Sequence, residues 1–259
     1  MTSKEFKRLC ESSFDRLFRL AEDRNQTQFF TSFFAIFRKG KYKHLSYVLD
    51  EEFQEVLEFF NSFFPIQSSD QVDVKTRTRT RIMLYCHTIE VDLIYLVLYN
   101  MIMTIKDKEY STIITFKDKR DEIREAVYAY KKIEIINKEC EDTGIELKLI
   151  FDELFKVQIR NAFSHSQYCL SPNGGFAISK YNSPTTSKVL TKSPNQDFFT
   201  HGEIHELFKK VDAYLESFIN IYKNYENKYA DGKPYKTLFG EVYFDNKHGW
   251  CFYSNKLGQ

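Results

Sequence analysis

The chain has 259 residues, with 37 Lys or Arg against 36 Asp or Glu, so its formal net charge at pH 7 is +1. This balance excludes the global basic field of proteins that bind nucleic acid indiscriminately, and any RNA or DNA site must be a local patch. Phenylalanine (25) and tyrosine (17) are abundant, whereas glycine (9) and proline (5) are scarce. Many large apolar groups and few chain breakers favour long packed helices over a many-turned β fold.

The cysteines and the polar N-terminus indicate the cellular compartment of the protein. The five cysteines are scattered and form no Cys-x-x-Cys pair: Cys10, Cys86, Cys140, Cys169 and Cys251. This spacing disfavours a zinc site and a disulfide scaffold, and it fits a reducing compartment. Residues 1–8 match neither a signal peptide nor a transit peptide. We therefore expect a cytoplasmic protein with no metal and no cofactor.

The first third of the chain has the periodicity of helices. Apolar residues recur at spacings of three and four over residues 3–37, which predicts a helix there. A second helix is expected over residues 45–64, ended by Pro65 because proline lacks the N–H that would continue the hydrogen-bond ladder. A polar loop should follow over residues 67–75.

The next helix is expected over about residues 76–104, and residues 82–105 are largely apolar. Two apolar stripes repeat every seven residues, which predicts one central helix that is covered on more than one side. Glu90 and Asp92 lie inside it, and an acid near the centre of a membrane helix costs roughly 2.5–3.5 kcal/mol. We therefore expect a buried bundle helix rather than a membrane span.

The second half alternates helices with short strands. A charged helix is expected over residues 118–140, with Ile123, Val127 and Tyr130 in its buried stripe, and another over 145–164. The Ser-Pro-Asn-Gly-Gly turn at 171–175 predicts a short strand after it, paired with residues 189–191. A helix over 203–226 and a hairpin of residues 241–244 with 250–253 complete the chain.

The residues best suited to catalysis are Arg160-Asn161-Ala-Phe-Ser-His165, at the end of the 145–164 helix. Arginine keeps its charge and pairs with phosphate oxygens, while histidine can take or give a proton near pH 7. Together they suit cleavage of a phosphodiester. Ser164 and Tyr168 are nearby polar groups for positioning.

Helix geometry limits how these side chains cooperate. Asn161 and His165 are four residues apart and share one face, whereas Arg160 lies about 140° round the axis from His165. Both can reach one phosphate if the helix bends or ends near His165, or if a second copy supplies its own pair. The alternative is a chance match, with Arg160 a surface charge and His165 at a helix end that favours cations.

Arg160-Asn161-x-x-x-His165, in this helical setting, resembles the signature of the HEPN superfamily. An apolar helix with embedded acids, a charged helix, the signature helix and a closing helix follow the order of a HEPN core, over about residues 76–226. The resemblance implies a metal-independent endoribonuclease that leaves a 2′,3′-cyclic phosphate and a 5′-hydroxyl. It also implies a homodimer with a composite cleft, and relatives that serve in toxin–antitoxin or antiphage systems.

By this resemblance Arg160, Asn161 and His165 are the catalytic candidates, and RNA is the substrate. Family members often add an acid or another polar group from the earlier helix, a role for Glu90 or Asp92, although a structural ion pair explains either acid as well. An antitoxin or another regulatory partner would accompany a toxin. The alternatives are a non-catalytic HEPN-like module that binds RNA, nucleotide or a partner protein, and a helical protein with a chance motif.

Two groups of basic residues lie outside the signature. One contains Arg77, Arg79 and Arg81, and the other runs from Lys117 to Arg124. Either could contact RNA phosphates, and solvated helix ends explain them equally well.

The sequence thus predicts a mainly α protein, a HEPN-like helical bundle with extra N-terminal helices and one or two small β-hairpins. The expected division is an N-terminal helical extension over 1–66, a HEPN-like domain over 76–226 and a C-terminal hairpin extension over 233–259.

Overall fold

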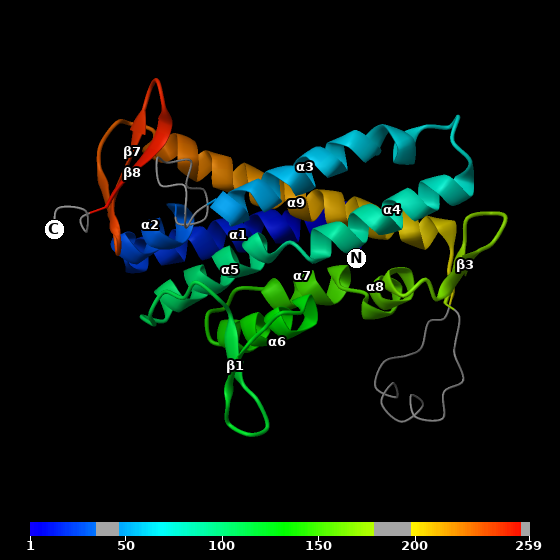
Figure 1. Ribbon diagram of the computed structural model, residues 1–259, viewed down its shortest axis with the longest axis horizontal. Helices are drawn as coiled ribbons and strands as arrows, with labels where there is room; N and C mark the ends of the chain where they lie inside the picture. The colour runs from blue at the N-terminus through cyan, green and yellow to red at the C-terminus, as the bar shows by residue number, and fades with distance from the viewer. Residues whose placement is uncertain (35–46, 179–197, 255–259) are drawn as a thin grey trace.

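The structure is a computed structural model that describes residues 1–34, 47–178 and 198–254. It is mainly helical, with small antiparallel sheets, as the composition predicts. In Figure 1 helices α1, α3, α4, α5 and α9 run along the length of the molecule. Helices α6, α7 and α8 lie along one side, while strands β7 and β8 and strand β3 mark opposite ends.

The N-terminal helices are α1 (Ser3–Arg24) and α2 (Gln26–Phe34). A capping box starts α1, because the Thr2 side chain accepts from the Glu5 amide while the Glu5 carboxylate accepts from the Thr2 amide. The predicted single helix is divided at Asn25, whose extended backbone (φ −155°) ends α1. The last three residues of the predicted helix, 35–37, lie outside the described residues.

Helix α9 (His201–Tyr229) is the longest helix described and packs along α1. Its contact with the N-terminal helices is aromatic: Phe14 and Phe18 meet Phe218 edge to face, with ring centroids 5.8 and 6.4 Å apart. Such pairs add to the burial of large apolar surface. The helix predicted over 203–226 is confirmed, and a second capping box of Thr200 with Glu203 starts it.

Helix α3 (Tyr47–Ser68) passes through Pro65, so the prediction that Pro65 ends the helix is wrong. Proline removes the N–H that would donate to the carbonyl four residues earlier, and the helix continues past it only to Ser68. The Pro65 carbonyl still accepts from the Ser69 amide at 3.0 Å. The loop that follows is shorter than predicted, because α4 begins at Val74.

The apolar stretch predicted as one helix is two, α4 (Val74–Ile89) and α5 (Asp92–Ile105). Asp73 caps α4 by accepting from two backbone amides, and Glu90 and Val91 separate the helices. By length and composition alone Val74–Ile105 could cross a membrane, but 78% of its most apolar window is buried inside the protein. Core helices pass the same test, so the stretch is weak support for a span.

The helix predicted over 118–140 is wrong in its first half. Residues 115–125 form a hairpin of β1 (Thr115–Lys117) and β2 (Ile123–Glu125), and α6 covers only Ala129–Cys140. The Asp118 carboxylate accepts from the backbone amides of residues 120 and 122, a local turn that competes with the helix. Ile123 and Val127, predicted in the buried stripe, are 75% and 63% exposed.

The helix predicted over 145–164 is divided into α7 (Leu147–Leu154) and α8 (Val157–Ser164). At the break the Lys156 amide donates to the hydroxyl of Tyr85 on α4, at 2.7 Å. Tyr85 is fully buried, and burial raises the pKa of its hydroxyl well above the ordinary value. A buried phenol thus holds the start of α8 against α4.

Short sheets fill the rest of the described chain. Strands β3 (Tyr168–Leu170), β4 (Phe176–Ile178) and β5 (Phe198–Phe199) form one, and the strand predicted at 189–191 lies outside the described residues. Strands β7 (Gly240–Asp245) and β8 (Gly249–Ser254) confirm the C-terminal hairpin, and β6 (Tyr235–Thr237) adds a third strand. One buried cluster joins residues of α1, α5, α9 and β7, and the three-part domain division stays a prediction.

Candidate functional site

Arg160 lies on α8, and its guanidinium is held at two points. Its Nε donates to Oε1 of Glu90 at 2.6 Å, and its Nη1 donates to Oδ1 of Asn161 at 3.2 Å. Glu90 follows the last residue of α4, and the packing of α4 on α8 brings the two together. A guanidinium carries five N–H donors, so these contacts leave three for an acceptor such as a phosphate oxygen.

Helix α8 ends beside His165, which is one of the conditions under which Arg160 and His165 could share a ligand. His165 is the last half-helical residue, and Ser166 adopts a left-handed backbone (φ 54°). The Gln167 amide then donates to the Ala162 carbonyl and the Ser166 amide to the Phe163 carbonyl, at 2.8 and 3.1 Å. These bonds are a Schellman closure, which satisfies the last carbonyls of a helix.

The imidazole of His165 is exposed and has no hydrogen-bond or ion-pair partner in the part of the chain that the structure describes. Asn161 and Ser164 are also exposed. No hydrogen bond among the described residues joins the Arg160 and His165 side chains. The structure therefore leaves the histidine accessible, and it does not unite the pair within one chain.

The other candidate residues, Asp92 and Tyr168, contact groups other than Arg160. Asp92, at the start of α5, pairs with the Lys132 ammonium of α6. Tyr168 stacks on Phe163 and Phe176, with ring centroids 5.6 and 4.8 Å away, and so packs α8 against the β3–β4 hairpin. Of the two predicted acids, only Glu90 contacts Arg160.

A hollow of about 270 Å³ opens beside Arg160, and sequence reasoning missed the residues that dominate it. Tyr128 and Tyr130 line it at the start of α6, with their rings stacked at 5.9 Å and 12°. They are 56% and 53% exposed, so the prediction that Tyr130 belongs to a buried stripe is wrong. No local signal reveals this pair, because its exposure depends on where α6 begins.

Cys86 lies close enough to Arg160 for the guanidinium charge to affect the pKa of its thiol. Burial raises the pKa of this thiol to about 12, although Arg160 acts in the opposite direction. A thiol with such a pKa stays protonated at neutral pH, so it is no nucleophile.

The basic cluster at Lys117–Arg124 is largely neutralised within its own hairpin. Lys117 pairs with Asp121 at 3.0 Å, and Arg124 pairs with Asp118 and Glu122 at 2.5 and 2.8 Å. These contacts favour the explanation of solvated surface charge for this group.

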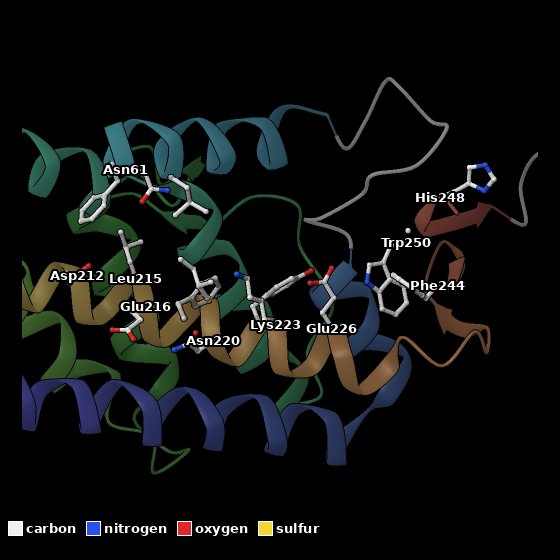
Figure 2. A pocket seen from close by; sticks show the side chains of 16 residues that line it. Asn61, Asp212, Leu215, Glu216, Asn220, Lys223, Glu226, Phe244, His248 and Trp250 are labelled. Atoms are coloured by element: carbon white, nitrogen blue, oxygen red, sulfur yellow. The ribbon is translucent and has the colours of Figure 1, made fainter. Parts of the chain in front are cut away.

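A groove of about 570 Å³ runs along α9 between α3 and the β7–β8 hairpin (Figure 2). Figure 2 shows Lys223 and Glu226 on α9 and Trp250 on the hairpin. Asp212, Glu216 and Glu226 outnumber the single lysine along it, which disfavours a phosphate there. None of the sequence-predicted site residues is among those that line it.

Among the described residues, no group of three or more His, Cys, Asp or Glu side chains is placed to hold a metal ion. Comparison with known proteins adds no assignment: no family model, no curated protein and no solved structure matches this chain.

Proposed function

We propose that this protein is a metal-independent endoribonuclease of the HEPN type, active as a homodimer. One observation carries the proposal. Glu90 and Asn161 orient the Arg160 guanidinium, which keeps three free N–H donors, and an exposed imidazole follows five residues later at the end of the same helix. These are the groups that RNA cleavage without a metal requires.

In the proposed reaction His165 of one copy takes the proton of the ribose 2′-hydroxyl. The 2′-oxygen attacks the adjacent phosphorus, the bond from phosphorus to the 5′-oxygen breaks, and a protonated imidazole gives the leaving oxygen its proton. The products are a 2′,3′-cyclic phosphate and a 5′-hydroxyl. Arg160 pairs with the non-bridging oxygens as their charge grows.

A second copy follows from the same chemistry. The attacking and leaving oxygens lie on opposite sides of phosphorus in an in-line displacement, so one imidazole is poorly placed to serve both. Arg160 and His165 also diverge around α8 within one chain. Two copies of α8 facing one groove would supply two imidazoles and two guanidiniums.

The stacked Tyr128 and Tyr130 support RNA as the substrate. Exposed aromatic rings bind bases of any sequence through stacking, and these two line the same hollow as Arg160. A toxin or antiphage-defence role, with an antitoxin or other regulatory partner, is part of the proposal and rests on the HEPN resemblance alone. The proposed cytoplasmic location rests on the scattered cysteines.

A second candidate function is a non-catalytic HEPN-like module that binds RNA, nucleotide or a partner protein. The ion pair between Arg160 and Glu90 favours it, because this contact accounts for the guanidinium without any substrate. Binding of RNA with no cut product would be its signature.

The test is cleavage of a defined RNA by the purified protein in EDTA. Arg160→Ala and His165→Ala should each reduce cleavage at least about 10²-fold, the lower end of what general acid–base catalysis contributes. Matched controls are Arg24→Ala, which removes an arginine paired with Asp107, and His248→Ala, which removes a histidine paired with Asp245. Cleavage that persists in both signature variants would overturn the proposal, as would products with 3′-hydroxyl ends.

A further inference from the structure

A second hollow, of about 470 Å³, lies between the end of α3, the first half of α4 and the first turns of α9. Basic side chains line much of it: Arg77, Arg81, His201, His205 and Lys209. None of these residues lines the hollow beside Arg160, and Arg77 and Arg81 belong to the basic group for which the sequence leaves open RNA contact or a solvated helix end. The chemistry of this hollow is therefore a separate question from that of the signature.

Arg81 is the unusual member, because it is buried and no carboxylate among the described residues pairs with it. Its exposed fraction is 5%, and its Nε and Nη2 donate to the side chain and the backbone carbonyl of Gln67, at 3.2 and 3.1 Å. A buried charge normally has a charged partner. These contacts provide donors for the Gln67 oxygens at the end of α3, but they bring no negative charge to balance that of Arg81.

His201 fixes Arg81 from the other side. Nη1 of Arg81 lies 3.2 Å from Nε2 of His201, and Nδ1 of His201 lies 3.0 Å from the Thr78 hydroxyl. Since a guanidinium only donates, Nε2 must accept, and the ring is neutral with its proton on Nδ1. Burial, together with Arg81 and Arg77, lowers the pKa of His201, which agrees with this neutral form.

Several N–H and ring-nitrogen groups around the hollow lack protein partners. Arg81 retains two N–H donors after its three contacts. Nε of Arg77 and Nδ1 of His205 are buried, and neither has a hydrogen-bond partner in the described chain. Arg77 makes one ion pair, at 2.9 Å, with Asp70, whose side chain is fully exposed. The start of α9 adds the positive end of a helix dipole.

The acidic residues at the hollow do not cancel its positive charge. Lys209 is paired with Glu206 at 2.8 Å, and Asp70 is paired with Arg77. Asp212 also lines the hollow, but no ion pair among the described residues joins its carboxylate to Arg77 or Arg81. Within residues 1–34, 47–178 and 198–254, no ion pair compensates the charge of Arg81.

We propose that this hollow binds the phosphate group of a small ligand, held by Arg77, Arg81 and His205. A phosphate supplies the negative charge and the several acceptor oxygens that these groups lack, and arginine matches its geometry. Phe64, 41% exposed at the same hollow, offers a ring to the organic part of a phosphate ester. This site does not depend on the proposed nuclease.

The test is calorimetric titration of the full chain at constant ionic strength with inorganic phosphate, AMP and adenosine. Phosphate and AMP should both bind, and tighter binding of AMP would identify an organic phosphate rather than the free ion. Adenosine should not bind. Equal binding of adenosine and AMP would overturn the proposal, as would no saturable binding by about 10 mM phosphate or AMP. Binding of single-stranded RNA alone would overturn it too.

Variants on one helix provide the control. Arg77→Gln should weaken binding of phosphate and AMP about tenfold, the effect of losing a charge-assisted contact. Arg79→Gln, on an exposed side chain of the same helix, should leave it unchanged. Arg81→Gln should abolish binding, but it also removes the contacts at the end of α3, so circular dichroism must show that it folds. Equal losses in Arg77→Gln and Arg79→Gln would show nonspecific attraction and refute the site.

Discussion

The Arg160 guanidinium donates through Nε to the Glu90 carboxylate at 2.6 Å, across the contact of α8 with α4. This ion pair joins two residues that are 70 positions apart in the chain. Asp92, the other acid of the same apolar stretch, does not share this contact and pairs with Lys132 instead.

Glu90→Ala should lower kcat for RNA cleavage about 10- to 100-fold with little change in KM, because a misplaced guanidinium loses charge stabilisation in the transition state. Glu90→Gln should restore much of the rate, since its amide oxygen can still accept from Nε. Asp92→Ala is the matched control: it should cleave normally but unfold more easily, by about 1–3 kcal/mol, because it leaves the Lys132 ammonium unpaired. Equal kinetic losses in Glu90→Ala and Asp92→Ala would contradict a positioning role for Glu90.

Replacing Tyr128 and Tyr130 together by alanine should weaken RNA binding about tenfold or more, since each stacked base is worth about 1–3 kcal/mol. Both rings are more than half exposed, so the melting temperature should change little. Fluorescence anisotropy of a labelled RNA measures the effect. Tyr253→Ala, which removes a tyrosine that is 69% exposed on β8, is the control and should bind as the wild type does.

Gly174→Ala should destabilise the protein by about 2–5 kcal/mol, from backbone strain and overpacking together. Its φ is +79°, and an added Cβ would lie 2.7 Å from Val74 and 2.9 Å from the Thr78 hydroxyl. Gly249→Ala has a similar φ of +72° with nothing within 4 Å, so it should cost only about 1–2 kcal/mol. Denaturant titrations compare the two, and equal losses would show that Gly174 is not needed for close packing.

Glu153 on α7 should make stability depend on pH. A hydrogen bond from Lys210 of α9, at 2.5 Å, is the main reason that the Glu153 pKa lies below its ordinary value of 4.5. A carboxyl whose pKa is lowered on folding stabilises the protein above its unfolded pKa, and this contribution is lost as the pH falls through the folded value. The pair is partly exposed, so the contribution is about 0.5–1 kcal/mol.

Glu153→Gln should therefore be less stable than the wild type at pH 7, and the difference should shrink below about pH 4.5. Urea unfolding at several pH values measures it. A difference that stays constant down to pH 3 would mean that Glu153 acts through packing rather than through its charge.

The start of α1 and most of α9 could be predicted from their apolar periodicity, whereas the break at Asn25 could not. Each has apolar residues at spacings of three and four and begins with a capping box. The hairpin before α6 could not, since the turn made by Asp118 outweighs the helical periodicity that follows it. Neither a proline nor a change in the apolar pattern marks the break between α4 and α5. Glu90, which lies at that break, pairs with Arg160, far along the chain.

The candidate site was predictable to a similar extent. The sequence names Arg160, Asn161 and His165, and helix geometry anticipates an end at His165. Local pattern does not show which of Glu90 and Asp92 turns toward the arginine. It does not show the stacked tyrosines either, because both depend on how helices pack.

Tyr85 adds a directed hydrogen bond to the aromatic interior of this protein. Phenylalanine rings pack between the helices through burial and shape, and they make no conventional hydrogen bond. The Tyr85 hydroxyl accepts one particular amide, that of Lys156, only four residues before Arg160. One directed hydrogen bond in the core thus ties the start of α8 to α4, the helix whose end brings Glu90 to the arginine. Tyr85→Phe would keep the ring and leave the Lys156 amide without this acceptor.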